Sequence, residues 1–178
     1  VNPGVSILSQ NLLSTSFFSA GYEYNINEEA SNFYLNYSYE GWYPILDFRA
    51  DQRRRKDAIR SGEETIALKW WETELAQTVR IPLDFSSRRY FRIFQPSIGI
   101  SYIHREMDKD VPRRFIVNNL VSLTYRLFYS QTSRSSRRDI FPRWGQSVDL
   151  IFRHDPFNVN GGRPETIGAA TGRVYLPG

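Results

Sequence analysis

A two-residue alternation of apolar and polar side chains is the feature that most constrains the fold of this chain. In the segment 121–129, Val, Leu and Tyr occupy the odd positions, while Ser, Thr and Arg lie at 122, 124 and 126. Successive side chains of a β-strand point to opposite faces, so this period predicts strands with one apolar and one polar face. About eight such runs follow one another, at 18–26, 33–40, 46–51, 71–83, 94–102, 121–130, 148–153 and 170–176.

The composition excludes a helical membrane protein. The mean hydropathy is −0.49 and 24% of the residues are charged, and no segment approaches the roughly eighteen consecutive apolar residues of a transmembrane helix. Membrane β-strands alternate and average out as polar, so a barrel stays possible. Aromatic residues make up 15% of the chain, which suits either a soluble sheet core or interfacial girdles. Cysteine is absent, which excludes a disulfide scaffold and a thiolate metal site.

The net charge of +4 raises the question of a nucleic-acid partner. The arginines are spread over strand positions, apart from small clusters at 53–55 and 134–138. We therefore expect no nucleic-acid partner. The cluster 53–56 with Arg60 could contact the phosphates of lipopolysaccharide, although an ordinary solvated loop explains it equally well.

Strand and connection lengths favour a membrane barrel over a soluble sandwich. Hairpin arms of about ten residues suit a tilted crossing of the hydrocarbon layer, whereas globular strands average about five or six. Outer-membrane barrels have short periplasmic turns and longer external loops. The expected connections follow that scheme, with short ones at 41–44 and 84–88 and longer polar ones at 54–64, 106–113 and 154–168. The connections at 27–31 and 133–139 depart from it mildly.

Two sets of residues are the candidate functional positions of such a barrel. Charged residues near strand centres on the polar face are expected to line a wet lumen: Glu23, Asp47, Arg49, Glu72, Glu74, Arg80, Arg126, Asp149 and Arg153. Aromatic residues near strand ends are expected at the depth of the lipid headgroups: Trp42, Tyr43, Trp70, Trp71, Tyr102, Tyr129 and Trp144.

The sequence thus predicts an all-β fold, an antiparallel transmembrane β-barrel. Residues 1–15 are expected to form a loop-like segment, and residues 16–178 to supply about eight strands of a larger barrel. The chain shows no signal peptide and ends in a turn-like Pro177-Gly178 without a terminal aromatic residue. We therefore expect a fragment whose barrel is completed by strands from elsewhere.

Three segments carry a family resemblance: Tyr-Glu-Gly-Trp-Tyr-Pro at 39–44, Val-Arg-Ile-Pro-Leu-Asp-Phe at 79–85 and Pro-Arg-Trp-Gly-Gln at 142–146. With the final Tyr-Leu-Pro-Gly, they make the chain from Ser16 onward resemble the C-terminal barrel region of surface-antigen-type outer-membrane proteins of Gram-negative bacteria. This superfamily contains the barrel-assembly insertases. The resemblance covers most of the chain, but its motifs mark turns and interfaces. Arg114-Phe115 lacks the glycine of the insertase lid motif, so insertase activity is not implied.

Few constellations point to catalysis. His154 and Asp155 could form the couple of a barrel protease, but adjacent strand residues point to opposite faces. Ser101 and His104 are three residues apart, which also places them on opposite faces and argues against a phospholipase. We expect no catalytic residue.

The acidic loop offers no stronger prediction of a metal site. Glu106, Asp108 and Asp110 have the oxygen ligands that Ca²⁺ prefers, but solvated loop acids explain them as well. No phosphate-binding glycine loop and no zinc-ligand spacing occurs. We expect neither a metal nor a cofactor.

The expected function is non-enzymatic: an outer-membrane β-barrel segment that acts as a scaffold, pore wall or partner-docking surface. Outer-membrane lipid, lipopolysaccharide, further barrel strands and partner outer-membrane proteins are the expected partners. A soluble all-β binding domain is the alternative from another class, and a rim-active barrel hydrolase is the third.

Overall fold

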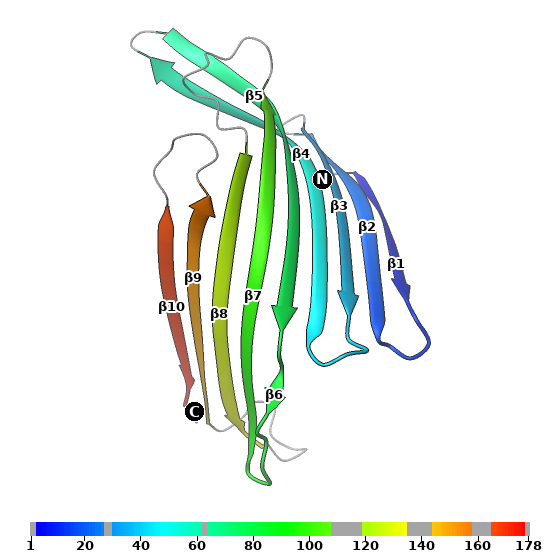
Figure 1. The fold of residues 1–178 in the computed structure, drawn as a ribbon, viewed down its shortest axis with the longest axis vertical. Coiled ribbons are helices and arrows are strands. Elements are labelled where there is room, and N and C mark those ends of the chain that lie inside the picture. The colour runs from blue at the N-terminus through cyan, green and yellow to red at the C-terminus, as the bar shows by residue number, and fades with distance from the viewer. Residues whose placement is uncertain are drawn as a thin grey trace.

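The structure is a computed structural model that describes residues 3–26, 30–61, 64–107, 119–134, 144–157 and 165–176. These residues form ten β-strands in a single sheet, shown in Figure 1. The strands are β1 (Gly4–Gln10), β2 (Ser16–Asn25), β3 (Ala30–Tyr39), β4 (Ile45–Ser61), β5 (Glu64–Arg80), β6 (Leu83–Asp84), β7 (Tyr90–Met107), β8 (Asn119–Ser133), β9 (Gly145–Phe157) and β10 (Thr166–Tyr175). Among the described residues, no helix is long and apolar enough to cross a membrane.

The sheet is an antiparallel meander in which the long strands follow sequence order. Its path is β1-β2-β3-β4-β5-β7-β8-β9-β10, and the two-residue β6 pairs with β7 beside this path. The predicted all-β antiparallel fold is confirmed, with nine long strands where we expected about eight. Strand lengths from 13 to 18 residues in β4, β5, β7, β8 and β9 exceed the usual globular length.

The first strand lies inside the segment that we expected to be loop-like. β1 pairs with β2 along its whole length, from Gly4 opposite Glu23 to Gln10 opposite Phe17. A tight turn joins them, in which the Asn11 side-chain oxygen accepts hydrogen bonds from the backbone N–H groups of Thr15 and Ser16, at 2.8 and 3.0 Å. In β1, only Val5 and Ile7 show the apolar–polar alternation. Two apolar positions are too few to identify a strand from the sequence.

A second difference concerns the predicted charged loop at 54–64. The backbone continues as β-ladder, with Arg54 opposite Trp71 and Ser61 opposite Glu64. Antiparallel pairing of backbone groups needs no apolar side chains, so charged residues can extend a hairpin into solvent. In Figure 1 this hairpin of β4 and β5 reaches beyond the neighbouring strands. The loops expected at 106–113 and 133–139 lie largely outside the described residues.

The short connection expected at 84–88 is confirmed as a tight turn. The backbone N–H of Ser86 donates to the Asp84 carboxylate at 2.7 Å, and Ser87 donates to the Tyr90 carbonyl at 2.8 Å. Hydrogen bonds from the Ser86 side chain and backbone hold the pKa of Asp84 below its usual range.

The register divides the sheet into two faces, because directly opposed residues of an antiparallel pair share a face. One face is apolar across many strands. A single row of opposed residues shows it: Ile7, Ala20, Leu35, Ala50, Leu75, Tyr102 and Val121. The neighbouring row, on the other face, is mostly polar: Leu8, Ser19, Asn36, Arg49, Ala76, Ser101 and Ser122.

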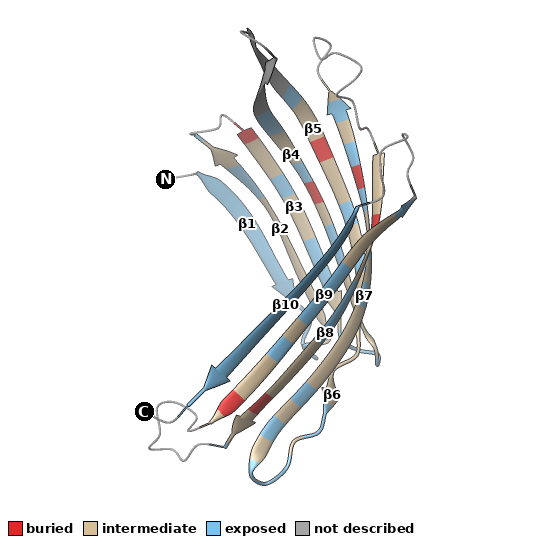
Figure 2. Ribbon diagram, turned by 90° about the vertical axis from the view of Figure 1, so that its left-hand side faces the viewer, coloured by how far each residue is buried: buried red, intermediate tan, exposed pale blue. Residues whose placement is uncertain are grey.

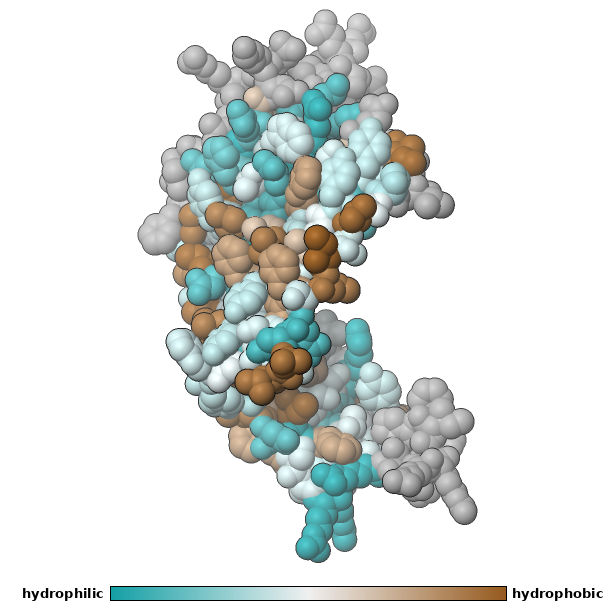
Figure 3. Space-filling model, turned by 90° about the vertical axis from the view of Figure 1, so that its right-hand side faces the viewer, coloured by the Kyte–Doolittle hydropathy of each residue, from teal (hydrophilic) through white to brown (hydrophobic). Residues whose placement is uncertain are grey.

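No described residue covers the apolar face. Among the described residues, Ala30 and Ile103 are the buried hydrophobic residues, whereas Leu75, Ile98 and Leu150 stay more than 40% exposed in central strands. Figure 2 shows the single curved layer, and Figure 3 shows brown side chains gathered across its middle with teal ones toward both ends. The sheet therefore has no second layer against which to form a core.

The sheet is not closed. Tyr22 lies on β2, which pairs with β1 and β3, and Val174 lies on β10, which pairs only with β9. These two strands do not pair. The sheet therefore does not close into a barrel by itself, which is the outcome that we predicted. Both edges of the sheet, β1 and β10, are exposed along their whole lengths (Figure 2).

Replacement of Gly21 by valine is predicted to destabilise the sheet. A Cβ at Gly21 would lie 2.7 Å from Cε1 of Tyr34, the opposed residue on β3, so the ring must move. We expect a loss of about 1–3 kcal/mol in the free energy of unfolding, measured by urea titration. Gly172→Val is the matched control, since nothing lies within 4 Å of its added Cβ. Equal losses for the two variants would contradict the packing of Tyr34 over Gly21.

Candidate functional site: the charged concave face

All nine charged residues predicted to line a lumen lie on one face of the sheet. The registers connect them: Glu23, Arg53 and Glu72 share one row, and Arg80 shares another with Arg126. Asp47 and Arg49 lie six and four residues from Arg53 on β4, and Glu74 lies two residues from Glu72 on β5. Asp149 and Arg153 lie two residues on either side of Ile151, which opposes Arg126, so all of them share the face. The structure does not bring the nine together at one point. It distributes eight of them over three clusters of ion pairs and hydrogen bonds, and Glu23 lies outside these clusters.

The first cluster is centred on Glu72, which is 4% exposed. One carboxylate oxygen accepts from Arg53 on β4 at 2.7 Å, and the other accepts from Arg105 on β7 at 2.8 Å. Arg55 approaches to 3.7 Å, and Arg53 also reaches Glu74 at 3.4 Å. Two charge-assisted hydrogen bonds from opposite sides compensate the desolvation of this carboxylate.

The second cluster lies nearer the short turns. The Nε of Arg80 donates to Asp47 at 2.7 Å, and its Nη2 donates to Glu40 at 3.1 Å. Ser38 donates to the same Asp47 carboxylate at 2.7 Å. Further along β4, Arg49 forms an ion pair with buried Asp51. Each acid in this part of the face thus has a cationic partner.

The third cluster spans β7, β8 and β9. Arg126 and Asp149 form two parallel hydrogen bonds at 2.8 and 2.7 Å. Arg153 donates to the fully buried Ser122 at 2.7 Å, and Ser122 bonds to Ser101 at 2.7 Å. The face is thereby held by polar side-chain contacts across every long strand from β4 to β9.

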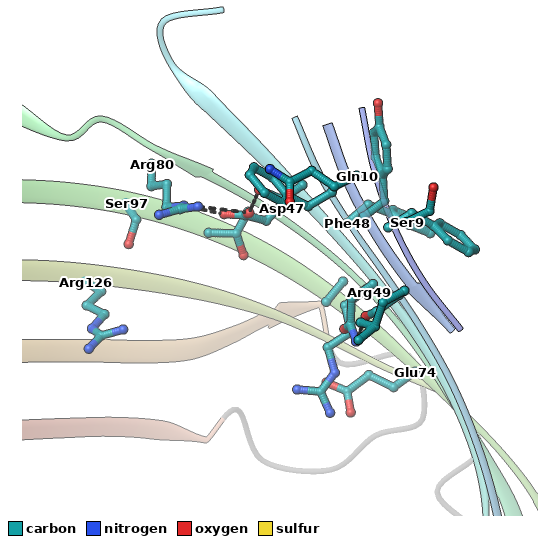
Figure 4. A pocket seen from close by; sticks show the side chains of 18 of the residues that line it. Ser9, Gln10, Asp47, Phe48, Arg49, Glu74, Arg80, Ser97 and Arg126 are labelled. Atoms are coloured by element: carbon teal, nitrogen blue, oxygen red, sulfur yellow. Dashed lines mark hydrogen bonds and ion pairs between the residues drawn. The ribbon is translucent and has the colours of Figure 1, made fainter. Parts of the chain in front are cut away.

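A hollow of about 940 Å³ lies over this face. Asp47, Arg49, Glu74, Arg80 and Arg126 contribute to its lining, and Figure 4 shows Arg80 bonded to Asp47 with Arg126 beside them. Most of the lining comes from the polar face, so that face is the concave one. Mixed charges, mostly paired, give the hollow a polar and roughly neutral wall.

The predicted interfacial aromatic residues fall into two groups. Trp42 and Tyr43 are exposed in the β3–β4 turn, and Trp144 packs edge-on against Tyr90 at 6.0 Å, just before β9. The hydroxyl of Tyr129 donates to Gln131 near the same end of the sheet.

The other group lies toward the opposite ends of the strands. The hydroxyl of Tyr102 donates to Asn119 at 2.9 Å, and Arg54 lies 5.9 Å from the ring centroid of Trp71. Trp70 is different, because it lies on the charged face with Glu72. Adjacent strand residues point to opposite faces, so Trp71 lies on the apolar face and Trp70 does not.

The candidate catalytic residues do not form couples. The buried atoms His154 Nδ1 and Asp155 Oδ1 each have no hydrogen-bond partner, and the His154 ring stacks on Tyr125 with an interplanar angle of 2°. His104 bonds to Asn119 at 2.7 Å, away from Ser101. Among the described residues, neither candidate couple is therefore joined by a hydrogen bond.

No metal centre is found where the structure can be described. The searched residues contain no group of three or more His, Cys, Asp or Glu side chains that could hold an ion. Of the three candidate calcium ligands, Glu106 lies opposite Trp71, one residue before the end of the β5–β7 ladder, while Asp108 and Asp110 lie outside the described residues.

Sequence reasoning missed Arg105 as part of the charged face, and it did not single out the polar-face residues Asp51 and Ser122 as members of its clusters. Arg105 continues the strand parity of Ser101. Following the two-residue period past Tyr102, the last apolar residue of that run, would have found Arg105.

Comparison of the chain with protein-family models, with curated proteins and with solved structures found no match.

Glu72→Gln is predicted to destabilise the sheet, because it removes the charge that two arginines share. We expect a loss of about 1–3 kcal/mol in the free energy of unfolding. This range is modest because both arginines are partly exposed and solvent screens their charges. Glu23→Gln is the control in the same row of the sheet, since Glu23 is exposed and has no ion pair among the described residues. Urea unfolding of both variants measures the difference. An unchanged Glu72→Gln protein would show that the cluster contributes nothing.

Proposed function

We propose that this chain is a section of the wall of a transmembrane β-barrel in the outer membrane of a Gram-negative bacterium, with a structural and non-enzymatic role. The apolar face meets lipid, and the charged concave face lines a wet lumen. The section acts as a scaffold, pore wall or docking surface for partner outer-membrane proteins. The observation that carries the proposal is a continuous apolar face that none of the described residues covers.

Several dimensions support this assignment. On β7 the apolar-face residues from Phe94 to Tyr102 span nine positions, near the roughly 9–11 residues of a tilted membrane crossing. Tyr129 and Trp144 flank this band at one end, and Trp71 and Tyr102 flank it at the other, as interfacial aromatics do. Short turns lie at one end and the long β4–β5 hairpin at the other, in keeping with periplasmic and external ends.

The resemblance to surface-antigen barrels belongs to the same proposal. It is supported by the turn at 39–44 and the strand end at 79–85, where the chain passes between long antiparallel strands. The geometry also indicates which residues of the basic segment 53–56 are placed to contact lipopolysaccharide. Arg53 pairs with Glu72 on the concave face, so Arg54 and Lys56, which share the outer face, are the better placed contacts.

A soluble all-β binding domain is the alternative, and one observation favours it. A hollow of about 560 Å³ lies on the sheet near its β1 edge, where Val5, Ile7, Tyr22, Phe33 and Leu35 line it and an apolar ligand could bind. Such a domain would have to stay monodisperse in water without detergent. The wider apolar face, which extends from β1 to β10, argues against that behaviour.

A rim-active hydrolase is not supported, because His154 Nδ1 and Asp155 Oδ1 have no hydrogen-bond partner and so do not form a catalytic couple.

Arginine substitutions on neighbouring positions of β9 test the proposal. Leu150 and Ile151 are 43% and 37% exposed and lie on opposite faces. In lipid vesicles, Leu150→Arg is predicted to lower the free energy of unfolding by about 2–4 kcal/mol, and Ile151→Arg by much less. In water both positions are exposed enough to accept arginine at similar small cost. Equal effects in vesicles would contradict a lipid-facing apolar face.

A further inference from the structure

The two free edges of the sheet run in the same direction. β1 pairs only with β2 and β10 only with β9, and all neighbouring pairs on the nine-strand path are antiparallel. The first and the ninth strand of such a path must point the same way. The arrowheads of β1 and β10 agree in Figure 1.

The two edges carry few of the features that protect an edge strand from pairing. Such edges usually contain lysine, proline, inward charges or bulges. β1 contains no charged residue and no proline, and β10 contains one charge, Arg173. Val5, Ile7 and Val174 are 72%, 64% and 65% exposed, well above the 42% of Leu75 between two neighbours. Both edges are therefore suited to receive another strand.

A membrane makes such pairing necessary. Each unpaired backbone group in the hydrocarbon layer costs several kcal/mol, so an open edge does not persist there. Direct pairing of β1 with β10 would be parallel, because both run the same way. A second copy in the same membrane orientation would bring its β10 beside β1 in that same direction and would also give a parallel contact. Membrane barrels of this kind are built from antiparallel pairs.

We infer that an odd number of strands of other sequence completes the wall between β10 and β1. This inference rests on the proposed function. The completing strands begin and end antiparallel to the two edges. Next to Val5 and Ile7 on one side, and Ala170 and Val174 on the other, they carry apolar side chains outward and polar side chains toward the lumen.

The test adds strands of the chain's own sequence after residue 176 and asks how many close the wall. Copies of β9, then β10, then β9 again, joined by the turn sequence 11–15, give proteins with one, two or three added strands. Each protein and the unmodified chain is reconstituted in phosphatidylcholine vesicles. Amide hydrogen exchange of β1 is the readout, since pairing of its free edge protects it.

The β1 amides are expected to exchange roughly tenfold or more slowly in a protein with one or three added strands than in the unmodified chain. The two-strand protein is expected to exchange like the unmodified chain. Protection of β1 with two added strands, in none of the three proteins, or already in the unmodified chain would overturn the inference. The exchange of amides in the central strand β7 distinguishes a failure of this inference from a failure of the proposed function. If they are protected while β1 shows no odd–even pattern, only this inference fails; if they exchange freely in vesicles, the proposed function fails.

Discussion

The uncovered apolar face is the constraint on which the rest of this structure depends. A sheet usually buries such a face against helices or a second sheet. Here a row from Ile7 to Val121 presents only apolar side chains, and central residues such as Leu75 and Leu150 remain more than 40% exposed. Hydrophobic stabilisation must then come from whatever surrounds the sheet. A lipid layer would supply it over the entire face at once, whereas a protein partner would have to cover strands from β1 to β10.

The charged face follows from the same constraint. With no core to fix the strands, specificity has to come from the backbone ladders and from side-chain contacts on the concave side. Glu72 binds arginines from two neighbouring strands, and the pairs Arg80–Asp47 and Arg126–Asp149 act in the same way further along the sheet. Near balance of positive and negative groups lets these residues share a narrow concavity without strong repulsion.

Local patterns gave the strand content and the identity of the two faces, because both follow directly from the two-residue period. The pattern failed where backbone pairing acts without apolar side chains, as in β1 and in the charged end of the β4–β5 hairpin. It also could not identify partners distant in sequence. Glu72 lies 19 residues from Arg53 and 33 from Arg105, and only the sheet register brings these three together. Trp70 and Trp71 are a different case, because both lie near a strand end and only the two-residue period places them on opposite faces.

The most direct test of the account is a scan of solvent contact along β7 in lipid vesicles. The chain contains no cysteine, so single cysteines can be introduced from Ile93 to Ile103 and labelled with a nitroxide. Collisions with oxygen, which concentrates in lipid, are compared with collisions with a water-soluble nickel chelate. The account predicts a two-residue period, with oxygen dominant at the even positions 94–102 and nickel dominant at the odd positions between them. Nickel contact at every position, or no period at all, would contradict a sheet with one face in lipid.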